Sequence, residues 1–151
     1  MTPTGALRND HDVLRSKLAL LEGLLPLGHA ARFPMREFTY SISRLLRRHM
    51  EQETRVLSRL RAMESPRLLA PTSALLDEHQ DQRLTATLLL DLLLRGSDAP
   101  MDHIVLCASH LIEGSREHMA REETEVFPLI DEFHEHPVMQ PSSRLHAARV
   151  N

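Results

Sequence analysis

Two segments of the sequence repeat a pair of residues whose side chains commonly bind metal ions. His49 precedes Glu53 by four residues, and His118 precedes Glu122 by the same interval. On a helix, this spacing places both side chains on one face and directs them toward one point. Imidazole and carboxylate groups together suit iron or manganese. One such pair is weak evidence, so a metal site requires further ligands from elsewhere in the chain.

Two more histidines, His11 and His79, are positioned to supply those ligands. His11 lies 38 residues before His49, and His79 lies 39 residues before His118. Each half of the chain therefore has a histidine followed, at nearly the same interval, by His-Met-x-x-Glu. A helical hairpin used twice would give a site with pseudo-two-fold symmetry, which is usual for two metals in a helix bundle.

Prolines and glycines divide the chain into four segments with helical periodicity, which we expect at residues 6–25, 34–63, 72–95 and 98–133. Asp98 is a suitable N-cap for the fourth helix, and Pro128 is expected to kink it. Short connections make sequential helices antiparallel. The fold class predicted is therefore all-α, an up-down-up-down four-helix bundle within residues 1–133, followed by a C-terminal tail at 134–151.

The helix bounds also predict that the four histidines share one level of the bundle. His11 lies 15 residues before Pro26 and His49 lies 15 residues after Pro34, so both are about 22 Å from their shared connection at 1.5 Å per residue. His79 lies 16 residues before Arg95, and His118 lies 18 residues after Pro100. Arg95 and Pro100 flank the third connection, so these two histidines are also at similar distances from a shared connection. The helices thus bring the four imidazoles into one layer.

In the second and fourth helices, Glu53 and Glu122 interrupt apolar stripes that would otherwise form the core. Burying one unpaired carboxylate costs several kcal/mol, and a domain has only about 5–15 kcal/mol of stability in total. A pair of metal cations would offset that cost. The alternative is that the histidines bond to core neighbours and the carboxylates face water. We predict six metal ligands: His11, His49, Glu53, His79, His118 and Glu122.

The complete set resembles the hemerythrin-like (HHE cation-binding) family over residues 6–133. The matching pieces are Asn9-Asp10-His11-Asp12, the run from His49 to Glu53, Asp77-Glu78-His79, and the run from His118 to Glu123 followed by Val126-Phe127-Pro128. The resemblance implies that His11 and His49 bind one iron, and that His79 and His118 bind the other. It also implies two bridging carboxylates, Glu53 and Glu122, and an oxo or hydroxo bridge. Manganese or a mixed metal pair fits the same ligands.

Two departures from the oxygen-carrying hemerythrins narrow the implied function. Those proteins have a histidine four residues before the third-helix ligand, where this chain has Leu75, and an aspartate five residues after the fourth-helix histidine, where this chain has Glu122 at four. The ligand set is more similar to that of bacterial proteins that repair iron–sulfur centres. We therefore expect a di-iron protein that binds or reacts with O2, NO or peroxide in stress response or iron-centre repair.

Two other functions stay open at this stage. The domain could be an iron- or oxygen-sensing module that acts through a protein partner without catalysis, or a purely structural bundle. The sequence does not decide whether the protein is an enzyme, and it does not give the oligomeric state.

Composition excludes several classes of protein. The formal net charge is −3 and no dense block of Lys and Arg occurs, so we do not expect a nucleic-acid-binding protein. No apolar run is long enough for a signal peptide or a membrane span, so we expect a soluble, cytoplasmic protein. Cys107 is alone, which rules out a disulfide within the chain and a cysteine-based zinc or iron–sulfur site.

Four residues outside the ligand set have possible roles near it. Glu78 and Glu123 are adjacent to ligands and could bond to a ligand imidazole. His110, two turns before His118, is the remaining histidine best placed to take part. Gly114, one turn before His118, marks either a close contact between helices or space for a small ligand beside the metals.

Overall fold

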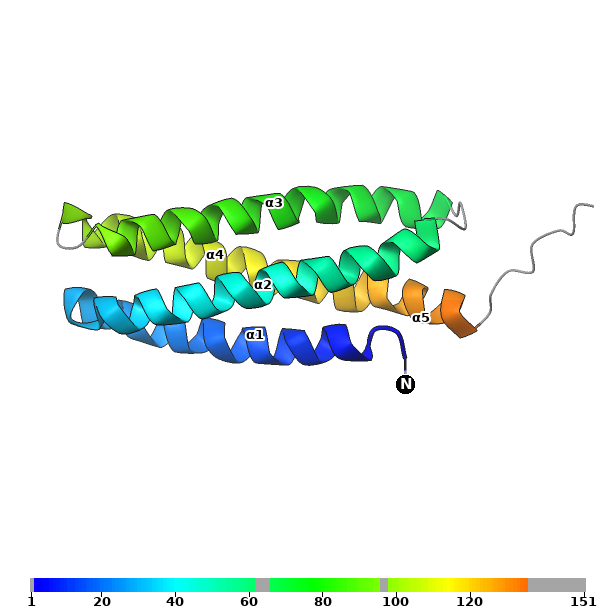
Figure 1. Ribbon diagram of the computed structural model, residues 1–151, viewed down its shortest axis with the longest axis horizontal. Coiled ribbons are helices and arrows are strands. Elements are labelled where there is room, and N and C mark those ends of the chain that lie inside the picture. The colour runs from blue at the N-terminus through cyan, green and yellow to red at the C-terminus, as the bar shows by residue number, and fades with distance from the viewer. Residues whose placement is uncertain (1, 62–65, 96–97, 136–151) are drawn as a thin grey trace, which may run out of the picture.

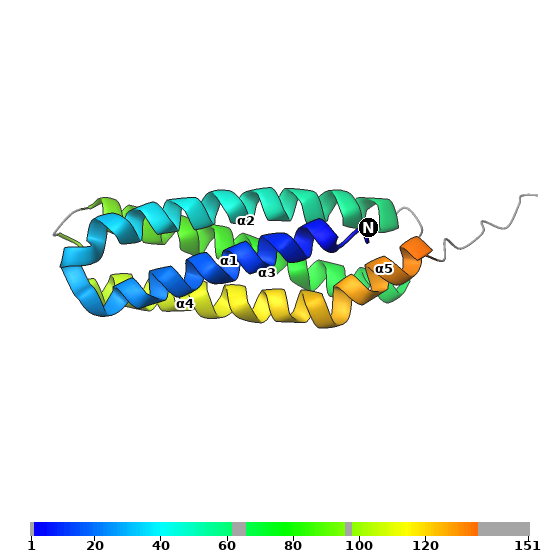
Figure 2. The same ribbon diagram turned by 90° about the horizontal axis from the view of Figure 1, so that it is seen from below.

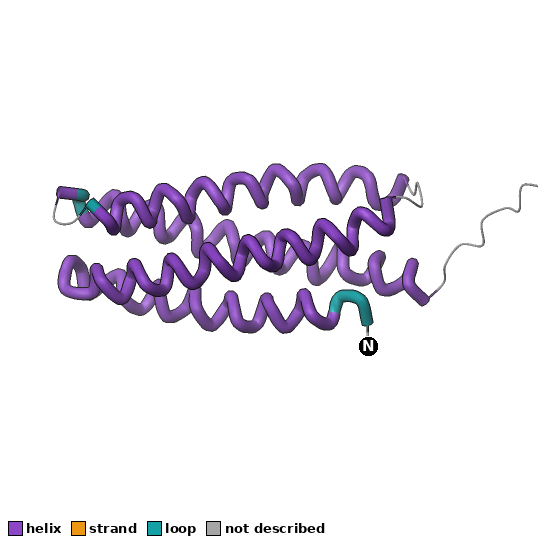
Figure 3. Tube along the Cα trace, in the orientation of Figure 1, coloured by secondary structure: helices purple, strands orange, loops and turns teal. Residues whose placement is uncertain are grey.

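The computed structural model describes residues 2–61, 66–95 and 98–135. Helices make up nearly all of these residues, and no strand occurs among them (Figure 3). In chain order, the elements are α1 (Gly5–Leu24), the 3₁₀ segment η1 (Leu25–Ala31), α2 (Arg32–Arg61), α3 (Pro66–Leu94), α4 (Met101–Arg121), the π-helical turn η3 (Glu122–Val126) and α5 (Phe127–Glu135). The all-α prediction is confirmed.

The long helices form an antiparallel bundle. α1 contacts α2 and α4, α3 also contacts α2 and α4, and all four lie along the long axis of the molecule (Figures 1 and 2). The η1 segment reverses the chain between α1 and α2, where Gly28 adopts a φ of 62° and a ψ of −146°. Glycine suits this turn because side-chain-bearing residues rarely adopt that conformation. The up-down-up-down topology is confirmed, and no described helix has the length and apolarity needed to cross a membrane.

The apolar core has two parts, which lie on opposite sides of a polar layer. The larger cluster includes Leu14, Leu18, Ile42 and Leu111, on the side of that layer nearer to η1. The smaller cluster lies on the other side and consists of the buried residues Leu7, Leu57, Leu75, Val126, Phe127 and Ile130. Along each helix, the residues between these clusters include the predicted metal ligands.

The third helix begins six residues earlier than the sequence predicted, at Pro66 instead of Thr72. Pro66 takes the first helical position, where a missing N–H costs nothing because that position has no intrahelical partner. Pro71 therefore lies inside the helix and removes only one backbone hydrogen bond in its second turn. The helix continues past this proline, and Thr72 and Leu75, which follow it, are buried.

The start of the fourth helix also differs from the prediction. Pro100, not Asp98, is the N-cap, with a φ of −58° and a ψ of 136°, and α4 begins at Met101. The Pro100 carbonyl accepts hydrogen bonds from the N–H groups of His103 and Ile104. No side chain caps this end. The proline ring fixes φ near the value that a helix entry requires, so Pro100 can serve without an Asp side chain.

A π-helical turn joins α4 to α5. The Phe127 N–H donates to the Glu122 carbonyl five residues earlier, and Pro128, which has no N–H to donate, follows directly. The helix bends at this junction, as Figure 2 shows. π-helical turns within α-helices are frequent at functional sites. Glu122 is the first residue of this turn. The helix then continues to Glu135, and residues 136–151 of the predicted tail lie outside the described residues.

Candidate metal centre

All four antiparallel helices contribute to one buried polar layer. His11 comes from α1, His49 and Glu53 from α2, His79 from α3, and His118 and Glu122 from α4 and the turn that follows it. Each of these six residues is at most 4% exposed. The sequence periodicity that directed them to the core face therefore holds, and their side chains form two adjoining groups.

The first group contains His11, His49 and Glu122. The His11 Nε2 atom lies 3.2 Å from His49 Nε2 and 2.9 Å from Glu122 Oε2. The His49 Nε2 atom lies 3.6 Å from the same oxygen. Three potential ligand atoms from three helical segments thus converge on a small buried volume.

The second group contains Glu53, His79, His118 and Glu122. The Nε2 atoms of His79 and His118 are 3.0 Å apart, and Glu53 Oε2 lies 2.9 Å from His79 Nε2. The His118 Nε2 atom lies 2.8 Å from Glu122 Oε1. Glu122 therefore directs one oxygen toward each group, as a carboxylate shared by two cations would.

The two glutamates are not equivalent. The resemblance in sequence implies that both bridge, but Glu53 lies with the second group alone. The structure therefore brings together all six predicted residues and gives one group three potential ligands and the other four.

The acids in this layer lack the hydrogen bonds that would explain their burial. Both oxygens of Glu53 and of Glu122 are buried, and none makes a hydrogen bond to a described residue. Imidazole nitrogens approach these oxygens without the geometry of an N–H directed at an acceptor. Atoms that converge in this way fit ligands around a common cation, and buried carboxylates require such compensation. The donor set therefore fits metal ions.

Two further carboxylates orient the imidazoles. The Nδ1 atom of His11 lies 2.7 Å from Glu123 Oε1, and the Nδ1 atom of His118 lies 2.6 Å from Glu78 Oε2. A carboxylate that accepts the Nδ1 proton leaves the Nε2 lone pair free to bind a metal. Glu78 and Glu123 thus occupy the supporting positions that their place in the sequence suggested.

Arginines at the surface hold these supporting carboxylates. Arg121 lies 2.6 Å from the second oxygen of Glu78, and Arg15 lies 2.8 Å from the second oxygen of Glu123. Sequence reasoning missed both arginines. Asp10 was also missed as a supporting residue, although its Oδ2 lies 3.9 Å from His49 Nδ1. The signal was present, because Asp10 precedes His11 directly, as Glu78 precedes His79.

We expect the Glu78→Ala and Glu123→Ala variants to bind metal about 10- to 100-fold more weakly, because each loses the group that fixes a ligand imidazole. Competition against a chelator of known affinity would measure the change. Glu117→Ala is the matched control, since Glu117 is an exposed glutamate on α4 that directly precedes His118 and is not part of this layer. Equal affinities in all three variants would contradict the supporting role.

Without metal, protons bound to imidazoles balance the buried acids. Burial lowers the pKa of His79, but contacts with Glu122 and Glu53 outweigh it and raise that pKa to about 9. The pKa of His118 is also raised, because contact with Glu122 outweighs burial. Burial raises the pKa of Glu53, whereas the surrounding imidazoles overcome burial and hold the pKa of Glu122 far below its usual range. Metal binding must therefore displace protons from this site.

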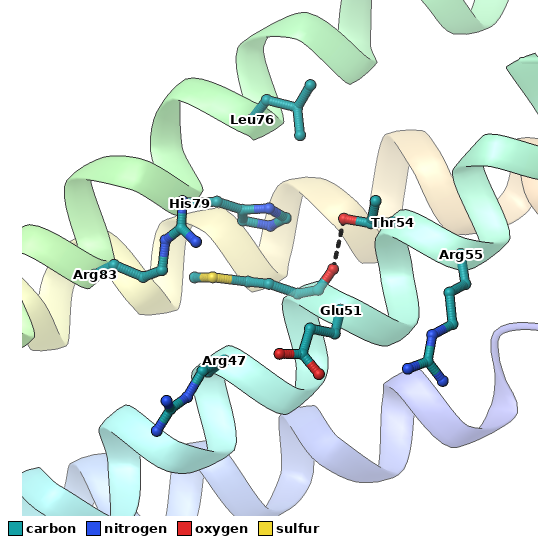
Figure 4. Close-up of a pocket in the computed structure, with 8 residues that line it drawn as sticks. Arg47, Glu51, Thr54, Arg55, Leu76, His79 and Arg83 are labelled. Carbon is teal, nitrogen blue, oxygen red and sulfur yellow. Dashed lines mark hydrogen bonds between the residues drawn. The ribbon is translucent and has the colours of Figure 1, made fainter.

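A groove between α2 and α3 leads from the surface to His79. Its volume is about 410 Å³, and its lining consists of Arg47, Met50, Glu51, Thr54, Arg55, Leu76, His79 and Arg83. Figure 4 shows the His79 ring between these two helices, with Thr54 donating a 2.7 Å hydrogen bond to the Met50 carbonyl. Three arginines and one glutamate give the groove a positive balance, which favours the approach of small anions.

His110 and Gly114 were two further candidates near the site. His110 is not part of the layer, because its side chain is 63% exposed and pairs with Asp81 at 3.2 Å. Gly114 does not mark a close contact between helices, because a Cβ atom added there would meet nothing within 4 Å, and its role in leaving room for a small ligand stays a prediction. Leu75, which stands where oxygen carriers have a histidine, is buried in the smaller apolar cluster.

Comparison with known families gives one match. The family model of the hemerythrin HHE cation-binding domain matches residues 2–130. No match was found among curated proteins or among solved structures. The matched region contains the six residues of the buried layer and both supporting glutamates.

Proposed function

Because the chain belongs to the hemerythrin HHE cation-binding domain family, we propose that it is a cytoplasmic, non-haem di-iron protein that binds or reacts with small ligands such as O2, NO or peroxide. The observation that carries this proposal is the placement of Glu122, whose two oxygens face separate pairs of imidazoles. The buried cluster of histidine and glutamate side chains is suited to metal ions. Two irons that share one carboxylate account for its division into two groups.

His11, His49 and Glu122 would hold one iron, and Glu53, His79, His118 and Glu122 would hold the other. Iron bound by three or four protein atoms has coordination positions left for small ligands and supplies redox chemistry. The protein's own contribution is to fix the imidazole tautomers through Glu78 and Glu123, and to exclude bulk water with the two apolar clusters.

We propose a role in stress response or iron-centre repair in preference to oxygen transport. Leu75 and Glu122 support this choice, since both differ from the residues of oxygen-carrying hemerythrins and give a site with four imidazoles. The arginine-lined groove at His79 offers a route by which a small anionic ligand could approach.

One observation favours a sensing module as the second candidate. The ligands come from all four antiparallel helices, so loss of metal would leave uncompensated acids between them. A change in metal state could then alter helix packing and be detected by a protein partner. Iron-dependent resistance to proteolysis without consumption of peroxide or NO would favour sensing over reaction.

The optical spectrum of the iron-loaded protein tests the proposal. We expect ligand-to-metal absorption bands that change on addition of azide, NO or oxygen, because open positions on iron bind such ligands. The metal-free protein is the control and should show no such bands. A chain that takes up no iron, or an iron-loaded spectrum that none of these ligands alters, would contradict the proposed function.

A further inference from the structure

Two buried polar side chains beside the metal layer have no hydrogen-bond partner among the described residues. Gln82 is 4% exposed, and neither its Oε1 nor its Nε2 atom makes a hydrogen bond. Ser115 is 1% exposed, and its Oγ atom is likewise unpartnered. Buried polar groups are almost always hydrogen-bonded, so these two residues require an explanation.

Their positions in the helices place both residues at one depth. Gln82 follows His79 by three residues on α3, and Ser115 precedes His118 by three residues on the antiparallel α4. At 1.5 Å per residue, each lies about 4.5 Å along the bundle from the imidazoles, in the same direction. A spacing of three also keeps each on its ligand's face of the helix.

The carboxylates lie on the opposite side of the imidazoles. Glu53 and Glu122 each follow a ligand histidine by four residues, toward the smaller apolar cluster. Gln82 and Ser115 lie toward the larger cluster. The side of the metal layer that the carboxylates leave free is therefore the side that faces this unpartnered amide and hydroxyl.

The internal repeat shows that the polar pair is specific to the second half of the chain. The positions that correspond to Gln82 and Ser115 in the first half are Leu14 and Leu46, and both are buried in the larger apolar cluster. The next layer along the bundle is also apolar, and consists of Leu18, Ile42, Ala86 and Leu111. Gln82 and Ser115 therefore lie between an apolar layer and the metal layer.

We propose that Gln82 and Ser115 hydrogen-bond the small ligand that binds the metals, and that this ligand binds on the side of the metal layer that faces the larger apolar cluster. The inference rests on the proposed function. The Gln82 amide N–H and the Ser115 O–H would donate to lone pairs on the ligand. Its chemical class is a two- or three-atom species with oxygen or nitrogen acceptors, because the apolar layer beyond leaves no polar contacts for a larger molecule.

Azide binding to the iron-loaded protein tests this proposal. Gln82→Leu carries the residue type of the corresponding position in the first half, and Ser115→Ala removes only the hydroxyl. We expect full iron content in both, and an azide dissociation constant about 10-fold higher for Gln82→Leu, since a hydrogen bond to a charged group is lost. Ser115→Ala should weaken azide binding in the same direction. Metal-free Gln82→Leu should also melt at a higher temperature than the metal-free wild type, because an unpartnered amide is removed.

Thr39→Val is the matched control. Thr39 is a fully buried residue on α2, ten residues before His49. Its hydroxyl already donates a 2.8 Å hydrogen bond to the Met35 carbonyl. This variant should leave azide affinity unchanged. Azide affinities within about twofold of wild type in iron-loaded Gln82→Leu and Ser115→Ala would overturn this proposal and leave the proposed function intact. Loss of iron from both variants would also overturn it, since their role would then be structural. A wild-type chain without iron would overturn both proposals.

Discussion

Replacement of Glu122 by alanine is expected to abolish binding of both metal ions. Glu122 belongs to both groups of potential ligands, with Oε2 near His11 and Oε1 near His118. Its loss removes the shared anion, so two mutually repelling cations would have to share the remaining carboxylate, Glu53, and the four neutral imidazoles. We expect the metal content of purified protein to fall from about two ions per chain to nearly none, as elemental analysis would measure.

Two further variants test whether the loss of both metals is specific to Glu122. Glu125→Ala changes an exposed glutamate in the same π-helical turn and should retain both metals. Glu53→Ala removes a ligand from the second group only, so we expect it to lose the metal of His79 and His118 first. Retention of both ions by Glu122→Ala would contradict the shared-carboxylate account.

The metal-free protein is expected to lose stability as the pH rises, whereas the metal-loaded protein should lose much less. The pKa of His79 is about 9 when folded, above its ordinary value of 6.5. The protonated His79 ring therefore stabilises the folded state, and this contribution is fully present below pH 6.5 and is lost as the pH rises through about 9. One pKa unit corresponds to about 1.4 kcal/mol, so His79 contributes up to about 3 kcal/mol to this loss. The raised pKa of His118 acts in the same direction.

Denaturant unfolding at pH 6, 7.5 and 9 would measure this difference, with and without bound metal. Metal-bound imidazoles carry no exchangeable proton at the ligating nitrogen, so the loaded protein should show a flatter profile. The metal-free His79→Leu variant is a suitable control, because it lacks the imidazole whose pKa is raised to about 9. Equal pH profiles for the metal-free and loaded forms would contradict the view that protons and metals compete for this site.

The fold and the depth of the site could be predicted because both follow from periodicity. Steps of three and four residues put His49 and Glu53 on the core face of one helix, and short connections fixed the neighbouring helices as antiparallel. Residue counts from the connections then gave the common level of the histidines. These are properties of regular helices, and they do not depend on the details of packing.

The features that were not predicted depend on details that the helical periodicity of the sequence does not specify. Pro66 and Pro71 are both acceptable near a helix start, and only the position of the first turn decides between them. The unequal placement of Glu53 and Glu122 depends on shifts of a few ångströms between helices, which an i, i+4 spacing does not encode. The place of Gln82 beside the site was not predicted, because its lack of hydrogen-bond partners is a three-dimensional property.

The most direct test is a crystal structure of the iron-loaded protein with anomalous scattering recorded at the iron edge. We expect two anomalous peaks, one beside the Nε2 atoms of His11 and His49 and the other beside those of His79 and His118, with an oxygen of Glu122 bound to each. A single peak, no peak, or iron bound away from Glu122 would contradict the account.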